Sequence, residues 1–459
     1  MTTASSSTNS DLRRRLLIAF SLPTLVLGIM HGPEGQLQAI YAKHAGLTLA
    51  ALAVATLFSK MFDAFTYPLI GYLSDRSYAR RGTRKNWVIA GTVVSVLGIW
   101  KLMRPPEHVD ALYFGIWMAT TYLGWKLMEI PIQAWSYGLS ADYAQRSRVQ
   151  GWRALAQIGG QFLFFAIPFL GMKLGYSDST ELDFRSLGFS AAICAIALPL
   201  ATLVMVVSVH DGVVVPPAAV KRPGLGEIFG AIRGNGPLLR LFMAFLPVNL
   251  FGGMSGGVVY LYMDTYLHLS KQFPAIMAFA MLAALAGIPF WTAMAARYER
   301  HRVWAIGLIF GGVACAGFAF LTPGPLALPL SFLLYPIITL ALSAAVIVYT
   351  MSADIVDYGR LTTGEDHAGL YGAMFAFLQK SLMGVAAAAG LAAVGFFGFD
   401  ATAATQSASG VFGIKLIGAI LPALGMLMAA AIIWNYSLTR ARLEEIQAQL
   451  QIKSAAEAG

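Results

Sequence analysis

Repeated runs of about twenty apolar residues constrain this 459-residue chain more than any other feature, because each run is long enough to cross a bilayer as one α-helix. Hydrophobic residues make up 57% of the chain and charged residues only 12%, a balance that no water-soluble fold would show. The runs lie near residues 15–43, 47–74, 87–104, 109–139, 148–174, 187–209, 238–266, 273–296, 303–322, 327–350, 368–397 and 409–436. We therefore expect an all-α integral membrane protein with about twelve transmembrane helices.

The basic residues alternate between the two sides of the predicted bundle. One side receives most of them: Arg13 to Arg15, Arg76 to Lys85, Arg146, Arg148, Lys221 to Arg240, Arg297 to Arg302, Arg360, Arg440 and Arg442. The other side receives fewer: Lys43, Lys101, Arg104, Lys173, Arg185 and Lys271. The positive-inside rule makes the first side cytoplasmic and predicts an inner-membrane protein with both termini inside. Because the charge is spread over alternate loops, the net charge of +9 indicates no nucleic-acid partner.

The longest polar interval divides the chain into two predicted halves. We expect a disordered tail over 1–14, six helices over 15–209, a cytoplasmic linker over 210–236, six helices over 237–436 and a cytoplasmic tail over 437–459. Within the linker, the spacing of Leu225, Ile228, Phe229 and Ile232 predicts a short surface helix. The triplet Ser140-Ala141-Asp142 recurs as Ser352-Ala353-Asp354, each after a span, which favours an internal repeat and the major facilitator fold.

Charged pairs inside the apolar runs are the candidate functional groups, because a charge in hydrocarbon needs a reason. Lys60 and Asp63 are three residues apart on one helix face, where they can neutralise each other. Lys126 and Glu129 repeat this spacing. His31 and Glu34 flank a Gly-Pro interruption that predicts a kinked helix.

Each of these pairs allows two interpretations. The pairs at Lys60 and Lys126 could be structural ion pairs, and the one at His31 a polar pair in a kink; alternatively, all three line a site for a solute or a proton. A further lysine, Lys380, lies about ten residues from either end of its run, which favours a pairing with an acid across the bundle over snorkelling to the surface.

Three segments of the sequence resemble the glycoside-pentoside-hexuronide cation symporters of the major facilitator superfamily. They are Asp63-Ala64-Phe65-Thr66-Tyr67-Pro68 with the basic turn after it, Met128-Glu129-Ile130-Pro131, and Asp354-Ile355-Val356-Asp357-Tyr358-Gly359 followed by Lys380. The resemblance covers nearly the whole chain. It implies a twelve-helix transporter in which a solute and a cation bind between two six-helix halves.

The resemblance also implies roles for individual residues. Asp63 matches an acidic member of the family's cation site, Glu129 an aspartate that binds sugar hydroxyls, and Arg153 an arginine that holds the sugar. Together with the polar and aromatic residues nearby, the expected solute-binding set is His31, Glu34, Tyr122, Trp125, Glu129, Arg153, Tyr371, Phe375 and Lys380. The expected cation-coupling set is Lys60, Asp63, Thr66, Tyr67 and Lys126.

The chain departs from the family pattern where a sodium ion would bind. Thr66 replaces an asparagine, Tyr67 replaces the second cation-binding aspartate, and Lys126 replaces a hydroxyl residue. Sodium requires several hard oxygen ligands, so these changes remove both charge and room. We hypothesise that the Lys126 ammonium bridges Asp63 and Glu129 in place of sodium, which leaves a proton as the coupling ion.

A second charged segment follows the first cation-site helix. Asp75, Arg76, Arg80, Arg81 and Arg84 resemble the gating loop of major facilitators, in which charges latch the two halves together. Alternatively, these charges only set the topology. Arg297, Glu299 and Arg300 in the corresponding loop of the second half favour the latch.

We therefore predict a secondary active transporter of a sugar, glycoside or related small solute, coupled to protons and not to sodium. Alternatives are an uncoupled facilitator, or a carrier of a larger amphipathic or anionic solute. From other classes, a solute-sensing receptor and a membrane enzyme compete, but the seven histidines form no metal-spaced cluster. No catalytic residue, metal or cofactor is expected, and the protein is expected to act as a monomer in the lipid bilayer.

Overall fold

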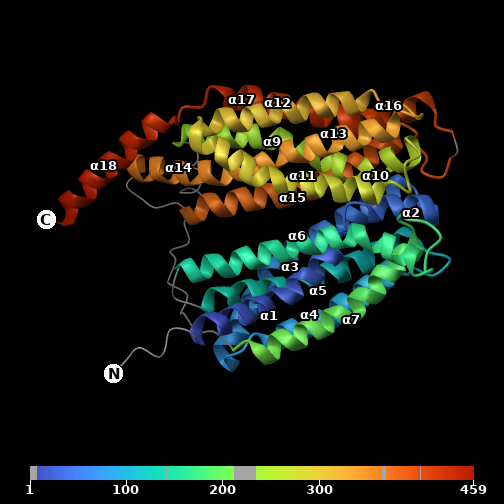
Figure 1. Ribbon diagram of the computed structural model, residues 1–459, viewed down its shortest axis with the longest axis horizontal. Coiled ribbons are helices and arrows are strands. Elements are labelled where there is room, and N and C mark those ends of the chain that lie inside the picture. Colours follow the sequence, from blue (N-terminus) through green and yellow to red (C-terminus); the bar gives the residue numbers. More distant parts are fainter. Residues whose placement is uncertain (1–7, 140–142, 211–233, 364–367, 404, 459) are drawn as a thin grey trace. The chain divides into compact units, whose positions relative to one another are not determined.

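The computed structural model describes residues 8–139, 143–210, 234–363, 368–403 and 405–458, and the regular elements among them are all helical. They group into two compact units, residues 1–218 with 270–275, and residues 219–269 with 276–459 (Figure 1). The first unit contains α1 Thr8–His31, α2 Leu37–Ala45, α3 Leu49–Arg81, α4 Lys85–Met103, α5 Ala111–Gly138, α6 Tyr143–Lys173 and α7 Phe184–Ser208.

In the second unit, three of the spans change their winding along their length. It comprises α9 Gly236–Gly256, α10 Val259–Leu261, a π-helix Tyr262–Tyr266, α11 Phe273–Arg297, α12 Arg300–Ala319, α13 Ala327–Leu342, a 3₁₀ turn Ser343–Ala345, α14 Val346–Thr363, α15 Ala368–Phe396, α16 Ala408–Lys415, a π-helix Leu416–Ile420, α17 Leu421–Trp434 and α18 Arg440–Ala458.

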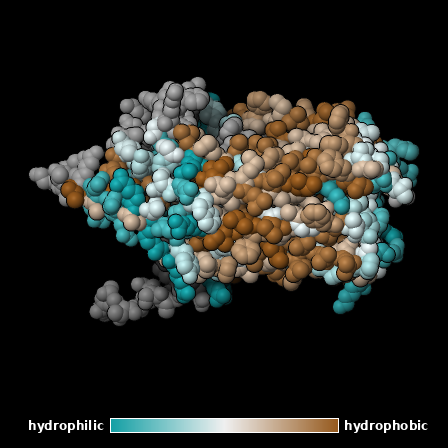
Figure 2. All heavy atoms as spheres, turned by 90° about the horizontal axis from the view of Figure 1, so that it is seen from above, coloured by the Kyte–Doolittle hydropathy of each residue, from teal (hydrophilic) through white to brown (hydrophobic). Residues whose placement is uncertain are grey.

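Ten helices of the described chain are long and apolar enough to cross a membrane. With α5 and α15, which are not among these ten, they account for the twelve spans that the sequence predicts. On the face shown in Figure 2, hydrophobic residues gather over the middle of the helices and hydrophilic residues over their ends. This distribution matches a protein that meets hydrocarbon around its middle.

The two units repeat one packing pattern. In the first unit α1 packs on α6 and α7, α5 packs on α3 and α4, and α4 packs on α7. In the second unit α9 packs on α15 and α17, α13 packs on α12, and α12 packs on α17. Trp291 of α11 donates its indole N–H to the Leu340 carbonyl of α13. This contact between α11 and α13 corresponds to the packing of α3 on α5 in the first unit. Counted as spans, the first, third and fourth helices of each unit therefore take the same neighbours, which is the internal repeat of a major facilitator.

The predicted interruption of the first span is confirmed. α1 ends at His31 and α2 begins at Leu37, with a turn over residues 32–36 between them. Pro33 has no N–H to continue the helical ladder, and the Gly32 position lies against the Phe164 ring of α6. The first predicted span is thus two helices whose junction carries His31 and Glu34.

Two predicted loops are helical instead. α3 continues to Arg81, where Gly82 ends it in the left-handed conformation (φ 67°), so the basic segment from Arg76 to Arg81 is helix and only three residues form the turn. Ser352-Ala353-Asp354 lies within α14 and not after a span. Ser140-Ala141-Asp142 and the predicted linker helix over 225–232 lie outside the described residues.

Glycine allows α1 and α6 to touch backbone to backbone. A Cβ at Gly160 would lie 2.0 Å from the Leu25 carbonyl oxygen and 2.8 Å from the Gly28 Cα. Without a strong hydrophobic force between helices in lipid, such close backbone contact is a main source of helix association.

We expect Gly160→Ala to reduce the free energy of unfolding by about 1–3 kcal/mol, because the added methyl group pushes α6 away from α1. Gly159→Ala is the matched control, since its Cβ would meet only the Leu25 side chain at 3.8 Å. Thermal unfolding of the purified protein in detergent measures both. Equal melting temperatures for the two variants would contradict the close-packed interface.

Candidate functional site

Three elements of the first unit bring six ionisable side chains together. The end of α1 with the turn after it supplies His31 and Glu34, α3 supplies Lys60 and Asp63, and α5 supplies Lys126 and Glu129. The six side chains, here called the charged cluster, keep between 9% and 31% of their accessible surface, so a water-sized molecule can reach each of them.

Glu34 is one end of the charged cluster. Its Oε1 accepts a hydrogen bond from Lys60 Nζ at 2.5 Å and another from the Tyr122 hydroxyl at 2.9 Å. The Lys60 ammonium also lies 4.4 Å from the centroid of the Tyr122 ring, close enough for a cation–π contact. The predicted pair between Lys60 and Asp63 is therefore wrong: an acid from the unwound turn reaches Lys60, although Asp63 shares its helix face.

His31 connects Glu34 to Glu129. Its Nδ1 lies 3.2 Å from Glu34 Oε2, and its Nε2 lies 2.9 Å from Glu129 Oε1. A neutral imidazole has one N–H donor, whereas both ring nitrogens here face a carboxylate. If both carboxyl groups are ionised, both contacts are hydrogen bonds only when the ring is an imidazolium, so the geometry matches a proton-carrying His31.

Lys126 connects the remaining two carboxylates. Its Nζ lies 3.4 Å from Glu129 Oε2 and 3.7 Å from Asp63 Oδ1. This is the bridging position expected from the sequence. Lys126 is the most deeply buried member of the charged cluster, with 9% of its side chain accessible, and Asp63 Oδ1 is buried without a hydrogen bond.

The order of charges along the charged cluster is strictly alternating: Lys60, Glu34, His31, Glu129, Lys126, Asp63. With a protonated His31, three cations face three carboxylates. With a neutral His31, one negative charge is in excess. The charge state of the whole group therefore depends on one proton.

Aromatic rings cover one side of the charged cluster. The Trp125 ring lies against His31 with 3.7 Å between ring centroids, and Tyr122 meets Trp125 edge-on at 5.4 Å. The Trp125 indole N–H is buried without a hydrogen-bond partner. These two predicted solute-binding residues are thus brought to the cluster.

The other predicted first-unit residues take different positions. The Thr66 hydroxyl donates to the Phe62 and Asp63 carbonyls of its own helix, and the half-exposed Tyr67 ring lies 5.7 Å from Lys126 Nζ. The Arg153 guanidinium donates to the side-chain oxygens of Gln133 and Gln150, and its Nε is buried without a partner.

Gln133 and Gln150 were not predicted as site residues. Gln133 follows Glu129 by four residues on α5, so a polar residue on the same face of an apolar helix was the available signal. Gln150 precedes Arg153 by one turn on α6. These two amides hold the guanidinium, because no carboxylate of the described chain lies within ion-pair distance of Arg153.

Tyr371 and Phe375 of α15 belong to the second unit. The Tyr371 hydroxyl accepts a hydrogen bond from the Asn235 side-chain amide, and Phe375 packs against Phe242 and Phe245. Both side chains are buried. The side chain of Lys380 lies outside the described residues.

The predicted gating residues lie at the end of α3. Asp75 accepts a hydrogen bond from Arg84 at 2.9 Å across the α3–α4 turn, and Arg76 reaches the Tyr72 hydroxyl. Arg80 and Arg81 are exposed on the last turn. In the second unit, Arg300 donates to both oxygens of Asp354. These ion pairs form inside each unit, and a latch between halves stays a prediction.

The repeated helix pattern and the buried charges define a multi-pass membrane transporter. The family model described as MFS/sugar transport protein matches residues 20–440, so the chain belongs to this family of major facilitators. The resemblance to glycoside-pentoside-hexuronide symporters is confirmed, and the protein is a secondary transporter and not an enzyme.

Several relatives cover most of the chain at low identity. The glucuronide carrier protein homolog of Escherichia coli (strain K12) is 23% identical over 96% of this chain and 96% of its own length. The putative glycoside/cation symporter YagG of the same strain is 23% identical over 89% and 88%. The sodium-dependent lysophosphatidylcholine symporter 1-A of Danio rerio is 22% identical over 87% and 81%.

Solved structures share the fold. An inward-facing, unoccupied bacterial homolog of the human lysosomal transporter Spinster aligns with a TM-score of 0.64 at 15% identity, over 94% of this chain and 97% of that one. The nucleoside transporter NupG aligns with a TM-score of 0.63 at 14% identity, over 93% and 100%. At these identities the likeness concerns the fold alone.

We expect Glu34→Gln to lower the free energy of unfolding by about 1–3 kcal/mol, because a neutral amide leaves the Lys60 ammonium and His31 without their carboxylate. Asp178→Asn is the control: its pair with Arg185 has the same 2.5 Å distance, but the side chains are 91% and 61% accessible. A surface pair of this kind contributes little. Thermal unfolding that shows equal losses would contradict a buried role for Glu34.

Proposed function

We propose that the protein transports a sugar or glycoside together with a proton and without sodium, by alternating access. The single observation that carries this proposal is that each carboxylate of the charged cluster already has a fixed partner, either a lysine or His31. A sodium ion needs several oxygen ligands at about 2.4 Å. The Lys126 ammonium lies beside two carboxylates that could supply them, Asp63 and Glu129.

His31 is the proposed proton carrier. In the proton-loaded state its imidazolium donates to Glu34 and Glu129, and the charged cluster is neutral. Release of the proton leaves one uncompensated carboxylate in a poorly solvated region, which is costly. The empty, deprotonated carrier is therefore disfavoured until it takes up another proton, and this preference couples the proton to the transport cycle.

The aromatic rings support solute binding beside this proton site. The Trp125 ring is buried against His31, and its indole N–H has no partner. A sugar presents hydroxyl oxygens, so one that reached this position could accept the hydrogen bond that the indole N–H lacks. The expected localisation is the inner membrane, with the arginine-rich ends of the helices in the cytoplasm.

Uptake into proteoliposomes tests the coupling. With methyl glucoside and methyl glucuronide as solutes, an inward proton gradient should raise the initial uptake rate severalfold, whereas a sodium gradient should leave it unchanged. His31→Gln should abolish the response to the proton gradient. Sodium-stimulated uptake by the wild-type protein, or an unchanged proton response in His31→Gln, would refute the proposal.

Arg153 favours an anionic solute as a second candidate. Its guanidinium is held by two neutral amides, and its Nε has no partner, so the arginine is available to a carboxylate. One relative carries a glucuronide in its name, which is an anionic sugar derivative. A hexuronide would place its carboxylate on Arg153 and its sugar ring near Trp125.

We expect Arg153→Gln to reduce uptake of methyl glucuronide about tenfold or more relative to methyl glucoside, since a charge-assisted contact is lost only for the acid. Arg153→Lys, which keeps the charge but not the fork of donors, should retain part of the preference. The ratio of the two uptake rates is the measurement. An equal loss for both solutes would make Arg153 a structural residue and would leave proton coupling untouched.

A further inference from the structure

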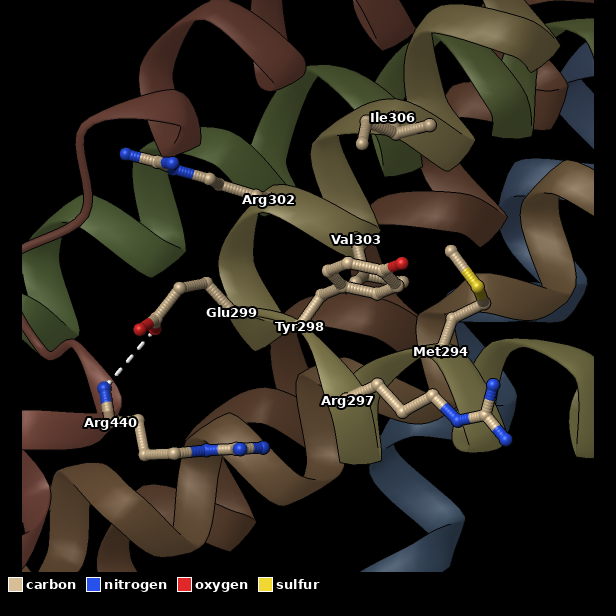
Figure 3. Close-up of a pocket in the computed structure, with 8 residues that line it drawn as sticks. All are labelled: Met294, Arg297, Tyr298, Glu299, Arg302, Val303, Ile306 and Arg440. Atoms are coloured by element: carbon tan, nitrogen blue, oxygen red, sulfur yellow. Dashed lines mark hydrogen bonds between the residues drawn. The ribbon is translucent and has the colours of Figure 1, made fainter.

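A pocket in the second unit lies apart from any residue assigned above to solute or proton binding. It opens at the ends of α11 and α12 and beside the start of α18, and its cavity volume is about 430 Å³ (Figure 3). Arg297, Arg302 and Arg440 contribute to its wall, against a single acid, Glu299. The pocket is therefore cationic.

The acid of the pocket is already engaged. Glu299 Oε2 accepts a hydrogen bond from the backbone N–H of Arg440 at 3.1 Å, drawn as a dashed line in Figure 3, and lies 3.8 Å from His301 Nδ1. The Arg440 guanidinium donates to the Ala295 and Ala296 carbonyls at the end of α11. These contacts fix α18 against the α11–α12 turn and hold Glu299 in place.

The other two arginines have no such contacts. Arg297 ends α11, Arg302 lies in the first turn of α12, and neither forms an ion pair or hydrogen bond within the described chain. Both are exposed. Two unpaired guanidinium groups at one pocket attract an anion, and the guanidinium fork matches phosphate oxygens.

An apolar surface continues from this pocket along the membrane-spanning part of α12. Ile306 lines the pocket, and Phe310 and Val313 follow it at helical spacing, each 62% accessible. The ring of Tyr298, 57% accessible, stands at the pocket as aromatic residues do at the membrane–water boundary. A phosphate at the arginines and an acyl chain along α12 would thus be parts of one ligand.

We propose that this pocket binds the phosphate headgroup of an anionic phospholipid at the arginine-rich end of the bundle. A lipid whose headgroup carries its own ammonium would bring a positive charge toward three arginines and is disfavoured. Free phosphate matches the arginines but gains nothing from the apolar surface of α12. Bound lipid would link α11, α12 and α18, since each contributes a lining residue.

Thermal shift on the purified full-length protein tests the site, with dioleoylphosphatidylglycerol, dioleoylphosphatidylcholine and inorganic phosphate as three separate probes. Phosphatidylglycerol should stabilise the wild-type protein more than phosphatidylcholine, and inorganic phosphate should have no effect. The double variant Arg297→Gln/Arg302→Gln should bind phosphatidylglycerol with an affinity lower by a factor of about ten or more. Arg442→Gln, on α18 but outside the pocket, should bind like the wild type.

Equal stabilisation by both lipids, or full binding by the double variant, would overturn the proposal. The same stabilisation by inorganic phosphate would assign the pocket to a soluble anion instead. An equal loss of phosphatidylglycerol binding in Arg442→Gln would show that binding depends on the general surface charge and not on this pocket. If the double variant does not fold, native mass spectrometry of the wild type decides: preferential retention of phosphatidylglycerol supports the site, and equal retention of both lipids refutes it.

Discussion

The alternation of charge between Lys60 and Asp63, through four intervening side chains, is the interaction on which the rest of the first unit depends. Moving an ion out of water costs several kcal/mol, and only close partners of opposite charge offset that cost. Each interior member of the charged cluster has a partner on both sides. The break after α1 and the packing of α5 on α3 serve this requirement, because they bring the six groups within reach.

In the proposed mechanism, this arrangement also limits which ions can take part in transport. A metal ion would have to displace an ammonium that is covalently tied to α5, whereas a proton needs only the lone pair of an imidazole. The relative from Danio rerio is named as sodium-dependent, yet it shares 22% identity with this chain. If this chain is coupled to protons as proposed, the two proteins use different coupling ions, and Lys126 is the residue proposed to make that difference here.

The fold followed from the sequence because apolar runs of sufficient length have one solution in a bilayer, the helix. The polar pairs were located for the same reason: Lys126 and Glu129 stand out in an otherwise apolar segment. Partners were harder to assign. Helical spacing placed Lys60 beside Asp63, but the carboxylate that reaches Lys60 is Glu34, which lies in an unwound turn. The direction of a side chain in such a turn cannot be inferred from helical spacing. Likewise, the basic residues after Asp75 have a loop-like composition, yet they extend α3 as far as the glycine that ends it.

The turn over residues 32–36 couples backbone shape to charge. Glu34 sits in this turn and not on a helix, while its three partners are attached to α1, α3 and α5. If α2 swings as a lever about Gly32 and Pro33, the carboxylate must move with it, and the ammonium and imidazole that it holds are released together. Such a displacement of the turn would change the electrostatic potential at His31, so the position of the backbone and the protonation of the imidazole would be linked.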